Sequence, residues 1–295
     1  MSSEAYWTPH RRACLTVLTA AVLLTLTDVL LRISEQPLPY LDAALRSLIS
    51  AGGAAALYLI VRRPAPKPFL RLHTVRAREA ALWLLFGICI SCTGAVLSVP
   101  LNLFWAQFTA LPPGQPVPQN AGEYLLGLLC TAAVPAVCEE TLCRGIVLRE
   151  YEAYGARAAV WASAVAFSLL HGAVTNLVFS LLLGLVFALI TVRAGSLYPA
   201  VIVHFAVNAF SLTMGYVTQE LIAPHLQSAF SLALNLLYAV LSLTFVFSFL
   251  WLLHAWRAKH SSDVQETPAK PHFGFSVSLI GIAVWYLAVQ LQFFF

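Results

Sequence analysis

Apolar residues in this chain are gathered into long runs, and short polar stretches separate the runs. Crossing the hydrocarbon core of a bilayer takes about 20 mostly apolar residues of α-helix, and most runs approach or exceed that length. Helices are the expected form because every backbone N–H and C=O in lipid must bond within its own segment. We therefore predict nine helical spans, at Cys14–Leu31, Leu45–Val61, Ala80–Phe108, Tyr124–Leu148, Ala158–Leu170, Leu177–Val192, Leu197–Val217, Phe230–Leu253 and Phe275–Phe295.

The composition supports an all-α, polytopic transmembrane bundle of about eight or nine spans. Hydrophobic residues make up 60% of the 295 positions and charged residues 10%, and the mean hydropathy is +0.79. A soluble globular domain usually has about 25% charged residues, so the lipid bilayer is the expected solvent. The modest net charge of +4 does not indicate a nucleic-acid partner. Because the first run contains Asp28, we interpret it as a retained anchor rather than a cleaved signal.

Basic residues predict the orientation, because Lys and Arg in short loops resist translocation. If the N-terminus is cytoplasmic, only Arg32 and Arg46 fall on the other side of the membrane. We expect an integral protein of a bacterial plasma membrane with three regions. These are the N-terminal helices and basic linker (1–123), the core helices (124–217) and the C-terminal helices (218–295).

Polar and ionisable residues inside the predicted spans form three groups. A charged side chain at bilayer depth costs several kcal/mol, so it usually faces the protein interior and marks function. Each group alone also has an ordinary explanation, since a lone histidine near a helix end is more often a packing or capping residue. The groups are Glu139, Glu140 and Arg144, then Phe167 and His171, then His204 and Asn208.

Helical spacing brings these groups to one region. Glu140 and Arg144 are four residues apart and share a helix face, whereas Glu139 points about 100° away. At 1.5 Å per residue, Glu139, His171 and His204 lie roughly 15, 20 and 10 Å from the cytoplasmic ends of their helices. These overlapping levels predict one cavity in the middle or the cytoplasmic half of the membrane.

A carboxylate and two imidazoles in such a cavity suit the activation of water. The carboxylate can take a proton from water while a histidine helps to hold the water, and imidazole and amide N–H groups can stabilise an oxyanion. Hydrolysis of a peptide bond within the membrane fits this set. Zinc is an alternative because Glu139, His171 and His204 are acceptable ligands. The position of Asn208 beside His204 favours a site without metal or other cofactor.

Three short motifs occur in order on separate spans, namely EExxxR (Glu139 to Arg144), FxxxH (Phe167 to His171) and HxxxN (His204 to Asn208). Together they resemble the motifs of the CPBP family, which includes the type II CAAX prenyl endopeptidases and bacterial bacteriocin-processing or immunity proteins. The resemblance covers about residues 124–217. It implies an intramembrane protease core of eight helices with a conical cavity open to the cytoplasm and to lipid.

The resemblance also implies a role for each motif residue. Glu139 is the implied water-activating base and His171 assists it, while His204 and Asn208 take the oxyanion role. Glu140 and Arg144 are the implied supporting ion pair. Because nine spans are one more than the core needs, we expect either the Cys14 run or the Phe275 run to be peripheral.

Two other functions remain open from the sequence. A non-proteolytic immunity or scaffold protein would keep the motif residues as a structural network, since buried ion pairs can be structural. A transporter would use them as a proton relay, although no internal repeat supports that reading. For the protease, the expected partner is a membrane-associated peptide or protein substrate, lipidated or not.

Overall fold

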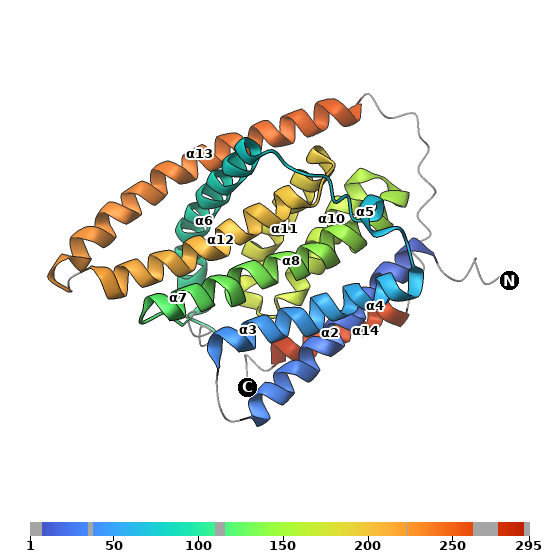
Figure 1. Ribbon diagram of the computed structural model, residues 1–295, viewed down its shortest axis with the longest axis horizontal. Coiled ribbons are helices and arrows are strands. Elements are labelled where there is room, and N and C mark those ends of the chain that lie inside the picture. The colour runs from blue at the N-terminus through green and yellow to red at the C-terminus, as the bar shows by residue number, and fades with distance from the viewer. Residues whose placement is uncertain (1–7, 35–37, 110–115, 223, 262–276, 292–295) are drawn as a thin grey trace.

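The computed structural model describes residues 8–34, 38–109, 116–222, 224–261 and 277–291, and the regular elements in these ranges are helices (Figure 1). Seven helical stretches are long and apolar enough to cross a membrane, and Ala156–Leu170 and Ile280–Val289 are shorter apolar helices. Each of the nine predicted runs coincides with one of these stretches, although the ends of the last run lie outside the described residues. The predicted all-α polytopic bundle is confirmed.

The helices are numbered in chain order. A short helix, α5 (Pro66–Phe69), lies in the basic linker. Short helical turns, η5 (Val217–Leu221) and η6 (Pro224–Leu226), precede the long α13. The principal elements are α2 (Pro9–Ile33), α3 (Pro39–Ser47) with η1 (Leu48–Gly52) and α4 (Gly53–Arg62), α6 (Ala77–Trp105), α10 (Ala156–Leu170), α11 (Val174–Ala194), α12 (Tyr198–Tyr216), α13 (Gln227–Ser261) and α14 (Val277–Leu291).

The helices are arranged so that the middle of the chain forms the centre of the bundle. In Figure 1, α2, α3 and α4 lie along one edge and α13 lies along the opposite edge, with α8 and α12 between them. α10 and α11 form a helical hairpin, and α12 packs against α11 and α6. The hairpin turn contains Gly172 at φ 73°, a left-handed conformation that glycine adopts without steric cost.

The span that carries the two glutamates is not a uniform α-helix. The α-helical pieces α7 (Ala121–Gly127), α8 (Val134–Glu140) and α9 (Leu148–Tyr151) alternate with the π-helical segments η2 (Leu128–Ala133) and η3 (Thr141–Val147). A 3-10 turn, η4 (Glu152–Tyr154), ends the span. Pro135 lacks the N–H that would bond to the carbonyl of Thr131 four residues earlier. π segments occur frequently at functional sites, and here they flank the two glutamates at the end of α8.

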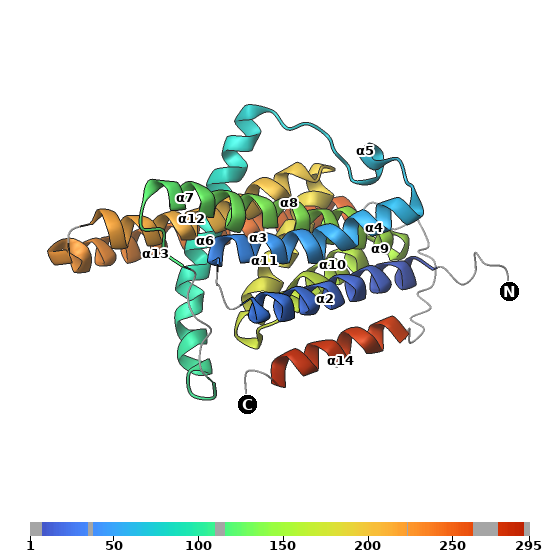
Figure 2. The ribbon, with the colours of Figure 1, turned by 60° about the horizontal axis from the view of Figure 1, so that its bottom comes forward.

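The last helix, α14, is the peripheral span. It packs chiefly against α2 and lies outermost beside it in Figure 2. Trp285 Nε1 on α14 donates a hydrogen bond of 2.7 Å to Thr25 Oγ1 on α2. In contrast, α2 is fixed to the core. Arg12 donates two hydrogen bonds of 2.7 and 2.6 Å to Glu150, and Tyr58 also donates to this carboxylate. One of two runs, beginning at Cys14 or at Phe275, was expected to be peripheral, and the structure identifies it as the Phe275 run.

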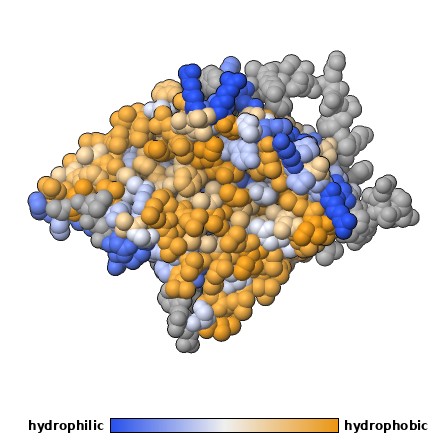
Figure 3. Space-filling view, in the orientation of Figure 1, coloured by the Kyte–Doolittle hydropathy of each residue, from blue (hydrophilic) through white to orange (hydrophobic). Residues whose placement is uncertain are grey.

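The outside of the bundle is apolar. Large hydrophobic side chains are exposed along most of the long helices, and Figure 3 shows them covering most of one face, with hydrophilic residues gathered mainly at its margins. On the span with the glutamates, Leu125, Leu129 and Val137 point outward. Soluble monomers rarely expose an apolar surface of this extent, whereas lipid tails would cover it.

Candidate active site

A cavity of about 1160 Å³ lies among the helices, and it collects the residues that the sequence predicted for catalysis. Its wall combines side chains from α2, α3, α6, α8 and the helices α10 to α14. Glu139, His171, His204 and Asn208 all line it, together with Phe167. The predicted convergence of three separate helices on one cavity is therefore present in the structure.

The cavity extends in a direction that the sequence analysis did not anticipate. Asp28, Arg32 and Arg46 line its wall near the connection from α2 to α3, at the end of α2 opposite to Arg12. With a cytoplasmic N-terminus, these wall residues lie toward the non-cytoplasmic side, and the cytoplasmic opening that the family resemblance implied stays a prediction. The cavity extends to these residues because α2, α3 and α14, which carry none of the three motifs, supply part of its wall.

Glu140 and Arg144 form a buried ion pair, as their spacing predicted. Arg144 Nη1 lies 2.8 Å from Glu140 Oε1, and neither side chain is exposed. Arg144 also donates a hydrogen bond of 2.9 Å to the carbonyl of Gly184 on α11. The rings of Phe167 and Phe187 lie 4.5 and 5.2 Å from the guanidinium carbon, and such cation–π contacts strengthen when they are desolvated. Arg144 thus joins three helices.

The Glu140 carboxylate also contacts His204, and the sequence did not predict this contact. His204 Nδ1 lies 2.9 Å from Glu140 Oε1, and because a carboxylate only accepts, Nδ1–H is the donor. Phe187 stacks on the imidazole at 5.2 Å between ring centroids. Glu140 therefore fixes the ring of His204 in addition to pairing with Arg144. For Nε2 to donate as well, the imidazole must carry a hydrogen on both nitrogens.

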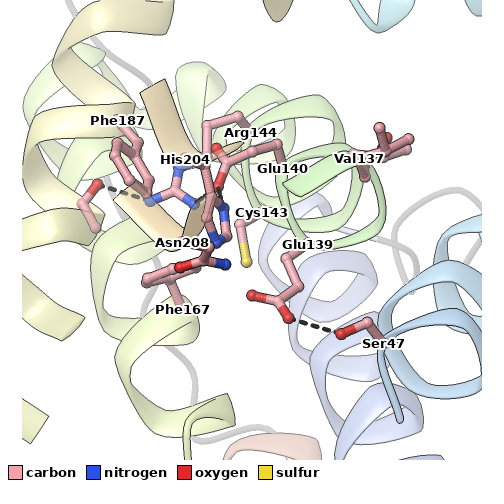
Figure 4. A network of polar contacts seen from close by, with 12 residues as sticks. Ser47, Val137, Glu139, Glu140, Cys143, Arg144, Phe167, Phe187, His204 and Asn208 are labelled. Atoms are coloured by element: carbon pink, nitrogen blue, oxygen red, sulfur yellow. Dashed lines mark hydrogen bonds and ion pairs between the residues drawn. The ribbon is translucent and has the colours of Figure 1, made fainter. Parts of the chain in front are cut away.

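Glu139 points away from this network, as Figure 4 shows. It is partly exposed, and its Oε1 accepts a hydrogen bond of 3.0 Å from Ser47 Oγ on α3. Adjacent residues on a helix point about 100° apart, which places the carboxylate of Glu140 in the protein interior and that of Glu139 on the cavity wall. The predicted division of the two glutamates between different helix faces is therefore present.

His171 lies at the turn between α10 and α11. Its Nδ1 is 2.8 Å from the carbonyl oxygen of Phe167, so Nδ1–H donates and the neutral ring keeps its lone pair on Nε2. Its ring is 4.4 Å from that of Phe167. Phe167 thus orients His171 through its backbone and contacts Arg144 through its ring. His171 and Glu139 both line the cavity, and each has a hydrogen bond to another partner, Phe167 for His171 and Ser47 for Glu139.

Asn208 lies one turn after His204 on α12. Its Nδ2 donates a hydrogen bond of 3.2 Å to the carbonyl of Thr131. In an α-helix this carbonyl would accept from the N–H of residue 135, which is missing in Pro135. An amide nitrogen carries two hydrogens, so one N–H of Asn208 is anchored and the second is left for a ligand in the cavity.

The described residues contain no group of three or more His, Cys, Asp or Glu side chains arranged to hold a metal ion. The imidazole of His204 is directed by its Nδ1–H toward Glu140, and that of His171 toward the backbone of Phe167. The metal-free site stays a prediction, and metal analysis tests it directly.

Several residues of the site were not identified from the sequence. Ser47, Thr131, Gly184 and Phe187 contact the motif residues only because helices distant in the chain pack together. The one available signal was the pairing of Pro135 with Thr131, since a proline inside a helix frees the carbonyl four residues before it. Nothing in the sequence distinguishes Ser47 from Ser50 in the same run.

Comparison with protein families relates the middle of the chain to a known family. The family model described as type II CAAX prenyl endopeptidase Rce1-like matches residues 121–210. The matched segment runs from α7 into α12 and contains the seven motif residues from Glu139 to Asn208. Neither the comparison with curated proteins nor that with solved structures found a match.

Proposed function

We propose that this chain, whose residues 121–210 belong to the Rce1-like family of type II CAAX prenyl endopeptidases, hydrolyses a peptide bond of a membrane-associated substrate through a water molecule activated by Glu139. The observation that carries the proposal is the single cavity lined by Glu139, His171, His204 and Asn208. Its position among apolar helices favours a substrate held in or on the bilayer, such as a lipidated peptide with a CAAX-type end.

In the proposed reaction, Glu139 accepts a proton from water, and Nε2 of His171 accepts a hydrogen bond from the same water. The resulting hydroxide adds to the carbonyl carbon of the peptide. The C–N bond then breaks, and Glu139 returns the proton to the leaving amine, so that a carboxylic acid and an amine are the products. General-base catalysis of this kind contributes about 10²–10⁴-fold to a rate.

His204 and Asn208 are proposed to stabilise the oxyanion of the tetrahedral intermediate. His204 uses its Nε2–H, since Nδ1–H is held by Glu140 at 2.9 Å. Asn208 uses the Nδ2 hydrogen that does not bond to Thr131. Donors that are fixed before the reaction need no reorganisation when the charge develops, which makes them effective.

We also propose that the N-terminus lies in the cytoplasm of a bacterium. The structure gathers basic residues at one end of the bundle, where Arg12 pairs with Glu150 and Arg71 pairs with Glu152. Arg71 belongs to the basic linker between α4 and α6, so this linker contacts the same end of the bundle. Clustering of Arg and Lys at one end supports this orientation through the positive-inside rule.

The test uses purified protein in lipid nanodiscs, in which both membrane faces are accessible. Three fluorogenic peptides are compared: one with an S-farnesyl cysteine followed by two aliphatic residues and a C-terminal residue, its non-prenylated counterpart, and a transmembrane peptide. We expect the wild type to cleave at least one of them and Glu139→Gln to cleave it at least about 100-fold more slowly. A folded wild type that leaves all three intact would contradict the proposal.

A second candidate, the non-proteolytic membrane scaffold, is supported by one observation. The network of Glu140, Arg144 and His204 is almost completely buried, so it would stabilise the bundle without any catalysis. Comparing membranes from cells with the wild type or Glu139→Ala separates the candidates. A peptide that persists uncleaved in the variant supports the protease, whereas an unchanged cellular function in the variant supports the scaffold.

A further inference from the structure

Ser47, which lies outside the three motifs, donates a hydrogen bond to the proposed base. Ser47 on α3 is buried, with 8% of its surface exposed, and its Oγ lies 3.0 Å from Glu139 Oε1. Because a carboxylate only accepts, the serine hydroxyl is the donor. Ser47 also lines the cavity that contains Glu139, and Figure 4 shows it on a helix separate from the motif helices.

This contact is not the usual bond of a serine within a helix. A helical Ser or Thr often donates to the carbonyl four residues earlier, as Ser50, Thr93 and Thr131 do here. Ser50 and Ser47 are both buried in the same composite helix, yet only Ser47 reaches across to Glu139. The direction of its hydroxyl is therefore set by the site rather than by its own helix.

The neighbouring contacts hold Ser47 in place. Arg46 Nε lies 2.7 Å from Asp28 Oδ1, and this ion pair connects α3 to α2. Its geometry does not meet the criteria of a hydrogen bond. On the other side, a Cβ added to Gly52 would lie 3.2 Å from the sulfur of Cys138. The missing side chain at Gly52 thus allows η1 to lie close to α8, which brings Ser47 within reach of Glu139.

We infer that Ser47 is a positioning residue for the Glu139 base, an inference that rests on the proposed function. By holding Oε1, the hydroxyl fixes the rotamer of Glu139 and leaves Oε2 to take the proton from water. A hydrogen bond to a charged group contributes more than one between neutral groups. This assigns a catalytic support role to α3, which lies outside the segment that matches the family.

The experiment compares the wild type with Ser47→Ala, Ser47→Thr and the matched control Ser50→Ala, using whichever of the three peptides the wild type cleaves. We expect kcat to fall about 10-fold or more in Ser47→Ala, because this variant loses a hydrogen bond to a charged carboxylate. KM should stay near the wild-type value, because the hydroxyl is engaged with Glu139. Ser47→Thr should recover most of the activity, and Ser50→Ala should be close to the wild type.

A second readout does not depend on turnover. Subtracting the infrared spectrum of a Glu139→Gln variant from that of its parent protein isolates the Glu139 carboxylate band. We expect this band to shift when the parent protein carries Ser47→Ala. It should not shift when the parent protein carries Ser50→Ala. Equal kcat values for wild type and Ser47→Ala, or no recovery with Ser47→Thr, would overturn the inference. If the wild type cleaves no peptide, the proposed function fails, and the infrared band still decides whether Ser47 holds Glu139.

Discussion

Two adjacent glutamates at the end of α8 have different neighbours, and their neighbours determine what each can do. Glu139 is partly exposed on the cavity wall and accepts one hydrogen bond from Ser47. Glu140 is completely buried and contacts Arg144 and His204. A base that exchanges protons with water needs the first environment, and a carboxylate that neutralises buried cations needs the second.

Exchanging each glutamate for glutamine separates these roles. Glu139→Gln keeps the size of the side chain but removes the base, so we expect cleavage to fall by about 10²–10⁴-fold or more. Its melting temperature should change little. Glu140→Gln removes the charge that pairs with Arg144, so its melting temperature should fall. Because Glu140 also holds His204, we expect Glu140→Gln to lower turnover as well, with some activity left in the folded fraction.

The two measurements are cleavage rate and melting temperature on the same purified preparations. A Glu139→Gln protein that cleaves at close to the wild-type rate would show that Glu139 is not the base. If Glu140→Gln melts at the wild-type temperature, the ion pair with Arg144 does not stabilise the fold.

Arg144 should matter more for folding than for chemistry. Its removal leaves the Glu140 carboxylate buried with fewer partners, and breaking a buried pair typically costs about 3–5 kcal/mol. Arg144→Ala should therefore have a clearly lower thermal midpoint in detergent. Arg144→Lys should recover only part of the loss, because lysine cannot reach both Glu140 and the Gly184 carbonyl with a planar fork. An Arg144→Ala protein as thermostable as the wild type would contradict this assignment.

Metal analysis tests the chemistry of the same residues. We expect purified, active protein to contain much less than one equivalent of zinc and to keep its activity after chelation, since the imidazoles of His171 and His204 are oriented by Phe167 and Glu140. One equivalent of tightly bound zinc, with activity lost on its removal and restored on its return, would require a metal-dependent mechanism instead.

At the scale of elements, close contact between α10 and α11 positions the turn that carries His171. A Cβ added to Gly184 would lie 2.9 Å from both Cα and the carbonyl oxygen of Ala164. The same glycine accepts a hydrogen bond from Arg144, so the approach of α11 to α10 and the placement of Arg144 depend on one small residue.

Gly184→Ala should separate these helices and lower stability. Overpacking a close contact typically costs about 1–3 kcal/mol, and cleavage should fall with it because His171 follows α10. The matched control is Gly215→Ala, where a new Cβ would meet Val117 at an ordinary 3.7 Å and alanine favours the helix. Equal melting temperatures for the two variants would contradict the packing argument.

At the scale of the whole molecule, the orientation decides from which side the cavity is reached. Ser34 and Lys67 are exposed at opposite ends of the bundle, and the six native cysteines are buried. A membrane-impermeant maleimide should label Ser34→Cys in intact cells and Lys67→Cys only after permeabilisation. The unmodified protein gives the background. The reverse pattern would invert the orientation and turn the Asp28 and Arg46 end of the cavity toward the cytoplasm.

The sequence alone determined the class of fold and the chemistry available to the protein. Apolar runs of membrane length dictate helices, because unpaired backbone groups are costly in lipid. The rarity of charge in those runs singles out Glu139, Glu140 and Arg144, and the four-residue spacing of Glu140 and Arg144 leads directly to their ion pair. These features are local in the chain, so no tertiary information was needed to find them.

The tertiary structure decided which residues meet across helices. The contacts of Glu140 with His204, of Asn208 with Thr131 and of Ser47 with Glu139 join positions 64, 77 and 92 residues apart. Helical periodicity says which side of a helix a residue occupies, but not which helix faces it or at what rotation. Those depend on how all the helices pack at once, including contacts permitted by glycines such as Gly52 and Gly184. For that reason Ser47 became recognisable only in the folded molecule.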